Sequence, residues 1–357
     1  MKSLKTFWRR ICICLFITVT PVLMAQQIVT GRITDAADGT PVQDASIIIA
    51  NTTIGTNSDE SGAYSLTVPG RGSFEIAVTH VGYRPVFHKI ATPQDSHQYN
   101  GALETVELDE IVVNAGKTYR QSDVNLFWRM ILGETPSKRG MEVINEEMVY
   151  FYLNSDRVLK VTCREPVEII NHHTGYCIRY VLKSFEHDYR TGETVSEGMP
   201  YFEELVPRNI NEQALWEKNR MKVYAVSLNC FLRALYREDI YKEGFLLENE
   251  DSRINGEPVN IKDFLLAGQG MVWVNIEEPL LLTYFTKPVT DQMILNGNWW
   301  DILGYETLVR FRPQQIGIYP DGTYEGTLSL GRINRYMGGL LSQVPIEYPD
   351  TTQMPKP

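Results

Sequence analysis

A rapid alternation of short apolar runs and turn residues over residues 27–113 constrains this chain more than any other feature. Asp38-Gly39 and Gly62 provide turns whose backbone shapes most other residues resist. Between turns the apolar side chains alternate, as in Tyr64 and Leu66, so one face of each segment is apolar. Six or seven such strands in under about 100 residues predict an antiparallel β-sandwich.

The same stretch carries a family resemblance. The segment VTGRITDAADGTPVQDASIIIANTTIGTNSDESGAYSLTVP, followed by VTHVGYRP, resembles the carboxypeptidase regulatory-like domain, a transthyretin-like sandwich of exported Bacteroidetes proteins. The resemblance covers residues 27–113 and implies an accessory module, not peptidase activity.

The end of this stretch, Leu108 to Ala115, also resembles the segment that precedes the plug of TonB-dependent outer-membrane receptors. The alternative, which we favour, is the last strand of the sandwich and its exit. The remaining chain, about 240 residues, is too short for a plug and a barrel of about 22 strands.

The first 25 residues have the layout of a secretory signal. Basic residues precede an apolar run from Ile11 to Val19, and Pro21 and the small residue Ala25 follow it. The alternative is an uncleaved N-terminal anchor, although the run is shorter than the roughly 20 residues of a membrane span. We therefore predict an exported protein in the periplasm or at the outer membrane of a Gram-negative bacterium.

Charge argues against a nucleic-acid partner. Removal of residues 1–25 would remove four basic and no acidic residues, which leaves 30 basic against 44 acidic side chains, a formal net charge of -14. An acidic chain has no general attraction to nucleic acid or anionic lipid. No other apolar run is long enough for a helical span, so we predict no transmembrane segment after signal removal.

The sequence pattern over residues 122–348 predicts an α+β domain. Residues 115–121 form a polar linker, and Ser122 or Asp123 is the expected cap of a helix that ends at Gly133. Strand-like runs follow and predict an antiparallel sheet. One long helix is expected over residues 210–245, because one apolar stripe recurs at helical spacing: Tyr224, Leu228, Phe231 and Leu235.

Two strand-like runs follow, NWWDILGYETLVRFRP and QIGIYPDGTYEG, with a turn expected at Asp321-Gly322, and then a helix is expected over residues 330–345. The predicted organisation is thus a signal, a sandwich domain over 26–114, an α+β domain over 122–348 and a polar tail over 349–357.

The second half resembles a C-terminal region that accompanies this sandwich in Bacteroidetes proteins of similar length. The segments that carry the resemblance are LNSDRVLKVTCREPVEIINHHTGYCIRYVLKSF, LWEKNRMKVYAVSLNCFLRALYREDIYKEGF and GGLLSQVPIEYP. That pattern usually has Gly-Ser and His-Phe where this chain has Val226-Ser227 and Cys230-Phe231. Any chemical role of that His is therefore absent here, and the resemblance implies no reaction.

The cysteines leave one question open. Cys163, Cys177 and Cys230 remain after signal removal, so at least one thiol stays unpaired within the chain. Cys163 and Cys177 lie in strand-like runs and could form a disulfide in an oxidising compartment. The alternative is that a strand between them keeps them apart.

No catalytic constellation is visible. The sequence lacks a His-Glu-x-x-His zinc motif, a Gly-x-Ser-x-Gly elbow and a phosphate-binding Gly-rich loop. The pair His172-His173 is more typical of a solvated turn than of a metal site. Ser227 and Cys230 lie on an apolar helix without a neighbouring base, which favours packing roles. We predict no catalytic residues, no metal and no cofactor.

Trp299 and Trp300 are the candidate binding residues. They follow the polar stretch Asn296-Gly297-Asn298, and exposed Trp beside turn residues can stack on a sugar or anchor a protein. At most one of them is expected in the core. Basic residues on the long helix are interspersed with acids, which predicts a solvated face with ion pairs: Lys218, Arg220, Lys222, Arg233 and Arg237.

These observations favour an exported, non-enzymatic envelope protein that docks or binds an envelope protein or a glycan. The alternatives are a carbohydrate-binding protein that uses Trp299 and Trp300, and a hydrolase whose site is assembled from distant residues.

Overall fold

The computed structural model describes most of the chain: residues 27–68, 72–91, 96–106, 119–133, 140–249, 259–268, 270–276, 280–285, 304–332 and 343–349. The predicted signal over residues 1–25 lies outside these ranges, as do Trp299, Trp300 and most of the predicted linker.

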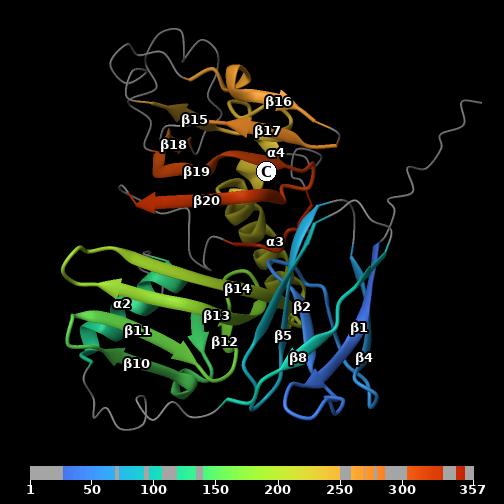
Figure 1. The fold of residues 1–357 in the computed structure, drawn as a ribbon. Coiled ribbons are helices and arrows are strands. Elements are labelled where there is room, and N and C mark those ends of the chain that lie inside the picture. Colours follow the sequence, from blue (N-terminus) through green and yellow to red (C-terminus); the bar gives the residue numbers. More distant parts are fainter. Residues whose placement is uncertain are drawn as a thin grey trace, which may run out of the picture.

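Two four-stranded sheets form the N-terminal sandwich, on the right in Figure 1. Their orders are β4-β1-β7, with β8 also beside β1, and β3-β2-β5-β6. The strands are β1 Gln27–Asp35, β2 Ser46–Ile49, β3 Gly55–Asn57, β4 Ala63–Val68, β5 Ser73–Thr79, β6 Val86–Ala91, β7 Ser96–Gln98 and β8 Gly101–Leu103.

The predicted sandwich is confirmed, with one difference in pairing. β1 is antiparallel to β4, as expected, but it runs parallel to β7 and β8. The core between the two sheets includes Val29, Ile47, Leu66 and Ile76, which are almost fully buried. Residues at alternate positions of each strand supply this core, which is the reason the period-two pattern identified it.

Outside the sandwich, a six-stranded sheet, which we call the second sheet, has the order β10-β11-β13-β12-β9, and β14 pairs with β13. Its strands are β9 Met141–Val143, β10 Val149–Leu153, β11 Val158–Cys163, β12 Val167–Asn171, β13 Tyr176–Asp188 and β14 Thr194–Glu204, and a 3-10 turn, η1 Glu146–Met148, precedes β10. Helix α2, Gln121–Leu132, packs on it through Phe127, whose ring meets Phe151 and Phe185 edge-on.

The start of α2 differs from the prediction. Its N-cap is Arg120, and Asp123 lies three residues into the helix, where its carboxylate accepts a hydrogen bond from the Arg120 backbone N–H at 2.7 Å. The acidic side chain therefore acts from inside the first turn instead of from the cap. The predicted end at Gly133 is confirmed.

The long helix predicted over residues 210–245 is wrong, because the structure divides it in two. α3 is Ile210–Ala225 and α4 is Leu228–Tyr236. Ser227 caps α4 by accepting a hydrogen bond from the Cys230 backbone N–H at 3.1 Å. The apolar stripe continues across the break, which is why periodicity alone did not reveal it.

The other six-stranded sheet, which we call the third sheet, has the order β15-β18-β19-β17-β16, with β20 beside β19. Its elements are β15 Phe245–Glu248, the 3-10 turn η2 Ile261–Phe264, β16 Leu265–Ala267, β17 Val272–Asn275, β18 Leu280–Phe285, β19 Gly304–Ile318 and β20 Tyr324–Arg332. The predicted turn at Asp321-Gly322 is confirmed. The helix expected over residues 330–345 is wrong at its start, since Leu330 to Arg332 belong to β20, and residues 333–342 lie outside the described ranges.

One apolar core joins the second sheet, the helices and the third sheet. α3 and α4 run behind and between these two sheets in Figure 1. α4 is buried along most of its length, and Phe231 meets Phe245 of β15 with ring centroids 5.4 Å apart. None of the helices in the described part of the chain is long and apolar enough to cross a bilayer.

The sandwich packs against the second sheet. Ile48, Ala50 and Ala77 on the outer face of its β2–β5 pair share a small apolar cluster with Val181 and Met199 of β13 and β14. Strand β2 is therefore buried on both faces, which is the physical reason for its unbroken apolar sequence.

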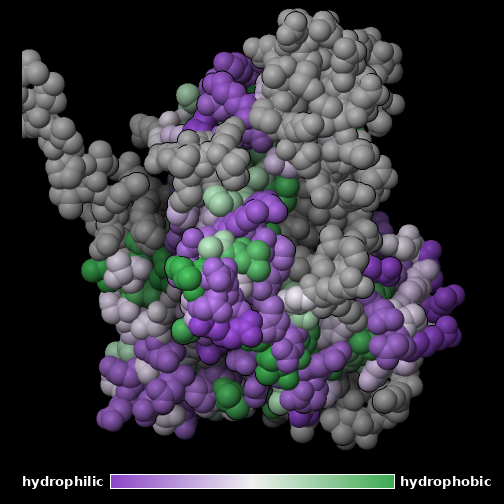
Figure 2. Space-filling view, turned by 180° about the vertical axis from the view of Figure 1, so that it is seen from behind, coloured by the Kyte–Doolittle hydropathy of each residue, from purple (hydrophilic) through white to green (hydrophobic). Residues whose placement is uncertain are grey.

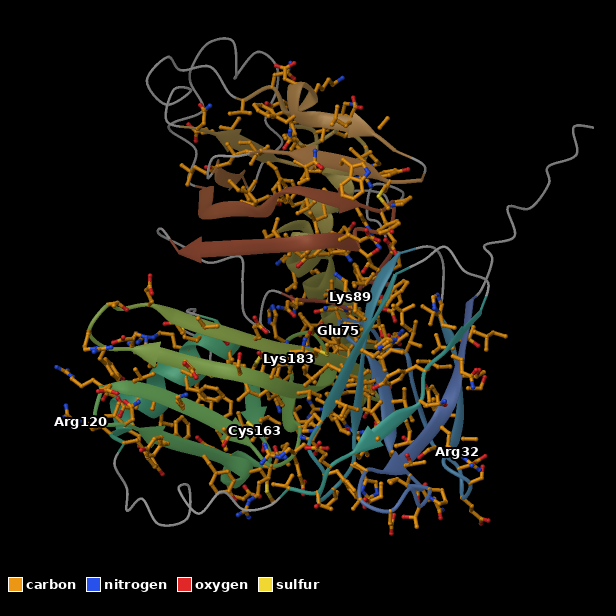
Figure 3. All side chains as sticks on the ribbon, viewed as in Figure 1. Arg32, Glu75, Lys89, Arg120, Cys163 and Lys183 are labelled. Carbon is orange, nitrogen blue, oxygen red and sulfur yellow. The ribbon has the colours of Figure 1, made fainter. Side chains whose placement is uncertain are left out.

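Polar contacts reinforce this interface. Backbone N–H groups of Asn51 and Phe202 donate to Pro200 and Thr52 oxygens at 2.7 and 2.9 Å. The Lys183 ammonium pairs with the Glu75 carboxylate across the same interface (Figure 3). The sandwich is thus held against the rest of the chain on one side. In Figure 2, the coloured part of the back of the molecule is mostly hydrophilic, with small apolar patches.

Candidate functional site

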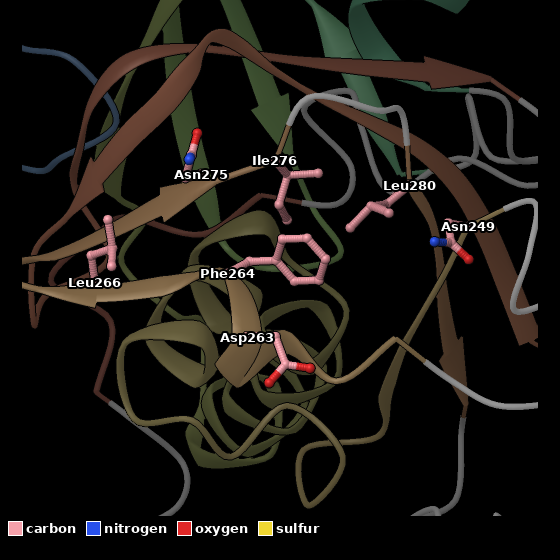
Figure 4. A pocket seen from close by; sticks show the side chains of 7 residues that line it. All are labelled: Asn249, Asp263, Phe264, Leu266, Asn275, Ile276 and Leu280. Atoms are coloured by element: carbon pink, nitrogen blue, oxygen red, sulfur yellow. The ribbon is translucent and has the colours of Figure 1, made fainter.

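A cavity of about 410 Å³ opens in the third sheet and is the candidate site. We call it the β16–β17 pocket and define it by the residues that line it: Asn249, Asp263, Phe264, Leu266, Asn275, Ile276 and Leu280. In Figure 4, Leu266 and Asn275 lie at one end, Leu280 and Asn249 at the other, and the Phe264 ring between them. A volume of this size is at the small end of ordinary ligand pockets, which span roughly 300–1,000 Å³.

Strand and turn ends place these side chains together. Asn249 follows β15, Asn275 ends β17, and Leu280 begins β18. Asp263 and Phe264 belong to η2, whose N-cap is Asn260. The Asn260 carboxamide oxygen accepts from the Lys262 N–H at 3.4 Å, and its NH₂ donates to Asp263 Oδ1 at 3.2 Å. These bonds hold the short turn, and with it Phe264, in place beside the pocket.

One wall of the pocket is apolar. Ile276 and Leu280 are buried and belong to the main core, so this wall is rigid. Phe264 is half-buried against the same core, and Leu266 on the edge strand β16 is 55% exposed. A half-buried ring beside an exposed Leu offers a surface on which an apolar ligand face can pack.

The polar groups of the pocket are amides and one carboxylate. Asn249 and Asn275 carry side chains that both donate and accept hydrogen bonds, whereas the Asp263 carboxylate only accepts. None of the seven lining residues is Ser, Cys, His or Lys. This set of donors and acceptors suits hydrogen bonding to a ligand.

The predicted binding residues Trp299 and Trp300 lie outside the described residues, so their binding role stays a prediction. The disulfide that the sequence left open is absent from the structure, where Cys163 and Cys177 are free thiols. β11 pairs with β13 at Lys160 and Glu186. Continued along that ladder, Cys163 falls six residues, or about 20 Å, from Cys177, whereas a disulfide needs Cα atoms within about 7 Å.

The other candidates from the sequence have structural partners. His172 and His173 lie in the turn between β12 and β13, where His172 Nε2 is 3.3 Å from Glu142 Oε2. Burial lowers the pKa of His173, and the positive charge of Lys222 lowers it further. Ser227 caps α4, and Cys230 is buried in the core. Within the described residues no three or more His, Cys, Asp or Glu form a group that could hold a metal ion.

Two arginines of the helices are buried, contrary to the prediction. Arg220 and Arg233 were expected on a solvated face, but both are 8% exposed. Arg220 donates to the Thr174 and Gly175 backbone oxygens at 2.7 and 3.1 Å. Its guanidinium also lies 4.0 Å from the Tyr176 ring centroid. A signal was present, because Arg220 shares the spacing of the buried stripe through Trp216 and Tyr224.

Arg233 joins three distant segments. Its guanidinium donates to the backbone oxygens of Asp321, Ile346 and Tyr348 at 2.9, 2.7 and 3.0 Å, and to the Tyr224 hydroxyl at 3.1 Å. It therefore ties α4 to the β19–β20 turn and to residues 343–349, which we call the C-terminal strap.

The strap also reaches the sandwich. Glu347 Oε1 accepts hydrogen bonds from the Thr53 backbone N–H at 2.7 Å and the Thr53 hydroxyl at 3.1 Å. The Ile346 N–H donates to the Asn51 oxygen at 2.7 Å. Burial raises the pKa of Glu347 despite these bonds, and it raises the pKa of Asp321 in the β19–β20 turn.

The sandwich belongs to a recognised family. Residues 29–113 match the family model of the CarboxypepD_reg-like domain, so this part of the chain is a carboxypeptidase regulatory-like domain, as the sequence predicted. No curated protein matches the chain.

Several solved structures show a weak likeness. One is a putative membrane-associated protein of unknown function from Bacteroides fragilis, with 13% identity over 50% of this chain and 95% of that one, at a TM-score of 0.19. A DUF3823 family protein from Bacteroides ovatus has 10% identity over 51% and 82%, also at 0.19. The major pilin subunit BcpA of Bacillus cereus has 15% identity at a TM-score of 0.20, and the likeness covers 23% of this chain and 30% of the pilin.

Proposed function

We propose that the protein is an exported, non-enzymatic component of the cell envelope that binds a partner or a glycan through the β16–β17 pocket. The observation that carries this proposal is the lining of the pocket, in which Phe264 and Leu266 offer an apolar surface and Asn249, Asp263 and Asn275 offer hydrogen bonds. An apolar pocket with a few convergent polar groups is the usual form of a binding site.

The packing of the sandwich supports a spacing role for that domain. Its β2–β5 face is occupied by β13 and β14, and the strap crosses from Arg233 to Thr53. A domain held in this way would present the pocket at a fixed distance and angle. The proposed domain limits remain 26–114 and 122–348, and the proposed location is the periplasm or the outer membrane.

Trp299 and Trp300 remain proposed contacts on the strength of their sequence. Their replacement by Ala in the double variant should reduce retention of the ligand without unfolding the protein. Unchanged retention would remove them from the site.

Site-specific photo-cross-linking in native envelopes tests the main proposal. A benzophenone amino acid would replace Leu266 in the pocket or, as the matched control, Leu215 on α3, since both side chains are 55% exposed. We expect a discrete cross-linked product from position 266 and none from position 215. Equal products from both positions, or no product from position 266, would contradict a pocket-mediated contact.

A further inference from the structure

The pocket has a charge signature that limits its ligand. Among the described residues that line it, Asp263 alone has an acidic side chain and none has a basic one. The adjacent Lys262 directs its ammonium to Glu238 Oε2, 3.3 Å away. An anionic ligand would therefore meet a carboxylate with no cation beside it among the described lining residues, which disfavours phosphates, sulfates and uronic acids.

The hydrogen-bonding groups favour a ligand that both donates and accepts. Asp263 can only accept, whereas the carboxamides of Asn249 and Asn275 do both. A hydroxyl group satisfies all three, because it carries one donor and two acceptor positions. A ligand with several hydroxyls can thus engage both ends of the pocket, since Asn275 and Asn249 lie on opposite sides of Phe264 (Figure 4).

The apolar wall adds a second requirement. The Phe264 ring lies at the centre of the pocket, between the two ends that carry the Asn side chains (Figure 4). Ile276 and Leu280 back it from the core and are 3% and 2% exposed. A ligand that fits must therefore carry an apolar face as well as its hydroxyls. The cavity volume of about 410 Å³ suits one or two small rings more than a long chain.

We propose that the β16–β17 pocket binds an uncharged sugar unit, with its apolar C–H face on Phe264 and its hydroxyls toward Asn249, Asp263 and Asn275. This inference rests on the proposed function and names the ligand class for the same site. Hydroxyl-rich edges and an apolar face occur together in a pyranose ring, and the pocket presents the complement of both.

Calorimetric titration of the full mature chain tests the ligand class. The probes are neutral oligosaccharides ending in glucose, galactose, mannose or N-acetylglucosamine, with oligogalacturonate as the anionic probe and spermidine as the cationic one. We expect at least one neutral probe to bind. Asn275→Ala should weaken it about tenfold through a lost hydrogen bond, whereas Asn211→Ala, an equally exposed amide on α3, should not.

Two further variants separate the outcomes. Phe264→Leu keeps most of the buried volume and should weaken the neutral probe about tenfold if the ring face is used, while an unchanged circular-dichroism spectrum excludes misfolding. Asp263→Asn should keep neutral sugar binding within a few-fold, because the amide oxygen still accepts. A cationic ligand would instead lose most of its affinity.

The failure of this inference differs from the failure of the proposed function. Binding of spermidine or oligogalacturonate, but of no neutral sugar, with loss in Asn275→Ala, would overturn the sugar class and leave a binding pocket. Absence of binding by every probe, together with a cross-link from position 266 to a protein, would also overturn the sugar class alone. Absence of both binding and cross-link would overturn the two proposals together.

Discussion

Replacement of Arg233 by Met should weaken the whole junction between α4, the β19–β20 turn and the C-terminal strap. Met keeps the apolar stem of the side chain but removes the donors that reach the backbone oxygens of Asp321, Ile346 and Tyr348. Each buried acceptor left without a partner costs about 1–3 kcal/mol.

Two effects reduce the simple total. The Ile346 oxygen keeps a second donor, the Asn229 carboxamide at 3.3 Å, and the guanidinium no longer has to be desolvated. We therefore expect a loss of about 2–4 kcal/mol in the free energy of unfolding. With a urea m-value of about 3 kcal/mol/M, the unfolding midpoint of the protein without residues 1–25 should fall by roughly 1 M.

The matched control is Arg208→Met. The Arg208 side chain is 86% exposed and pairs with Glu212, so its removal should leave the urea midpoint unchanged. Hydrogen exchange adds a local test, since the amides of the strap should lose protection in Arg233→Met. Midpoints that agree between the Arg233 and Arg208 variants would refute the argument that buried guanidinium bonds hold the strap.

Three further predictions concern single residues. Burial raises the pKa of Glu347 above its ordinary 4.5, so the folded state holds the proton more tightly than the unfolded state. The stability that this confers is present below pH 4.5 and is lost as pH rises through the folded pKa. Glu347→Gln should thus raise the urea midpoint at pH 7 more than at pH 4, and an equal change at both would contradict the assignment. Cys163 and Cys177 should both be alkylated after unfolding without a reductant, and a mass that shows a disulfide would be decisive against this. The folded Cys163 thiol should react slowly with the alkylating reagent at pH 8, because burial raises its pKa to about 12. Gly175→Ala should lower the unfolding free energy by more than about 1 kcal/mol, since Gly175 has φ +70° and its new Cβ would meet the indole of Trp216; thermal unfolding measures it, and an unchanged melting temperature would show that the turn can rearrange.

Local patterns identified the sandwich because its elements are short and joined by tight turns. Asp38-Gly39 and Gly62 mark turns that are decided within a few residues, and the alternation in β4 reports burial of one strand face. The apolar run in β2 is unbroken, whereas a strand with one buried face needs apolar residues only at alternate positions. It indicated burial on both faces, but not that β13 and β14 form the second cover.

Local patterns failed where distant residues decide the outcome. The stripe through Tyr224 and Phe231 is continuous across two helices, so periodicity could not show the break at Ser227. Arg233 was assigned to solvent because charged side chains are seldom buried without partners. Its partners Asp321 and Ile346 lie 88 and 113 residues away in the sequence, so the residues around Arg233 do not predict them.

The sequence by itself determined the β-sandwich and its family, the β-rich character of the second half and the turns at Gly133 and Asp321-Gly322, because each follows from contacts within a few residues. Tertiary structure alone decided the pairing of the sandwich with β13 and β14, the separation of Cys163 from Cys177 and the pocket. These depend on which strand ends meet in space. Asn249, Phe264 and Leu280 share a cavity because sheet pairing brings β15, η2 and β18 together, and that pairing is set by long-range packing that no local pattern encodes.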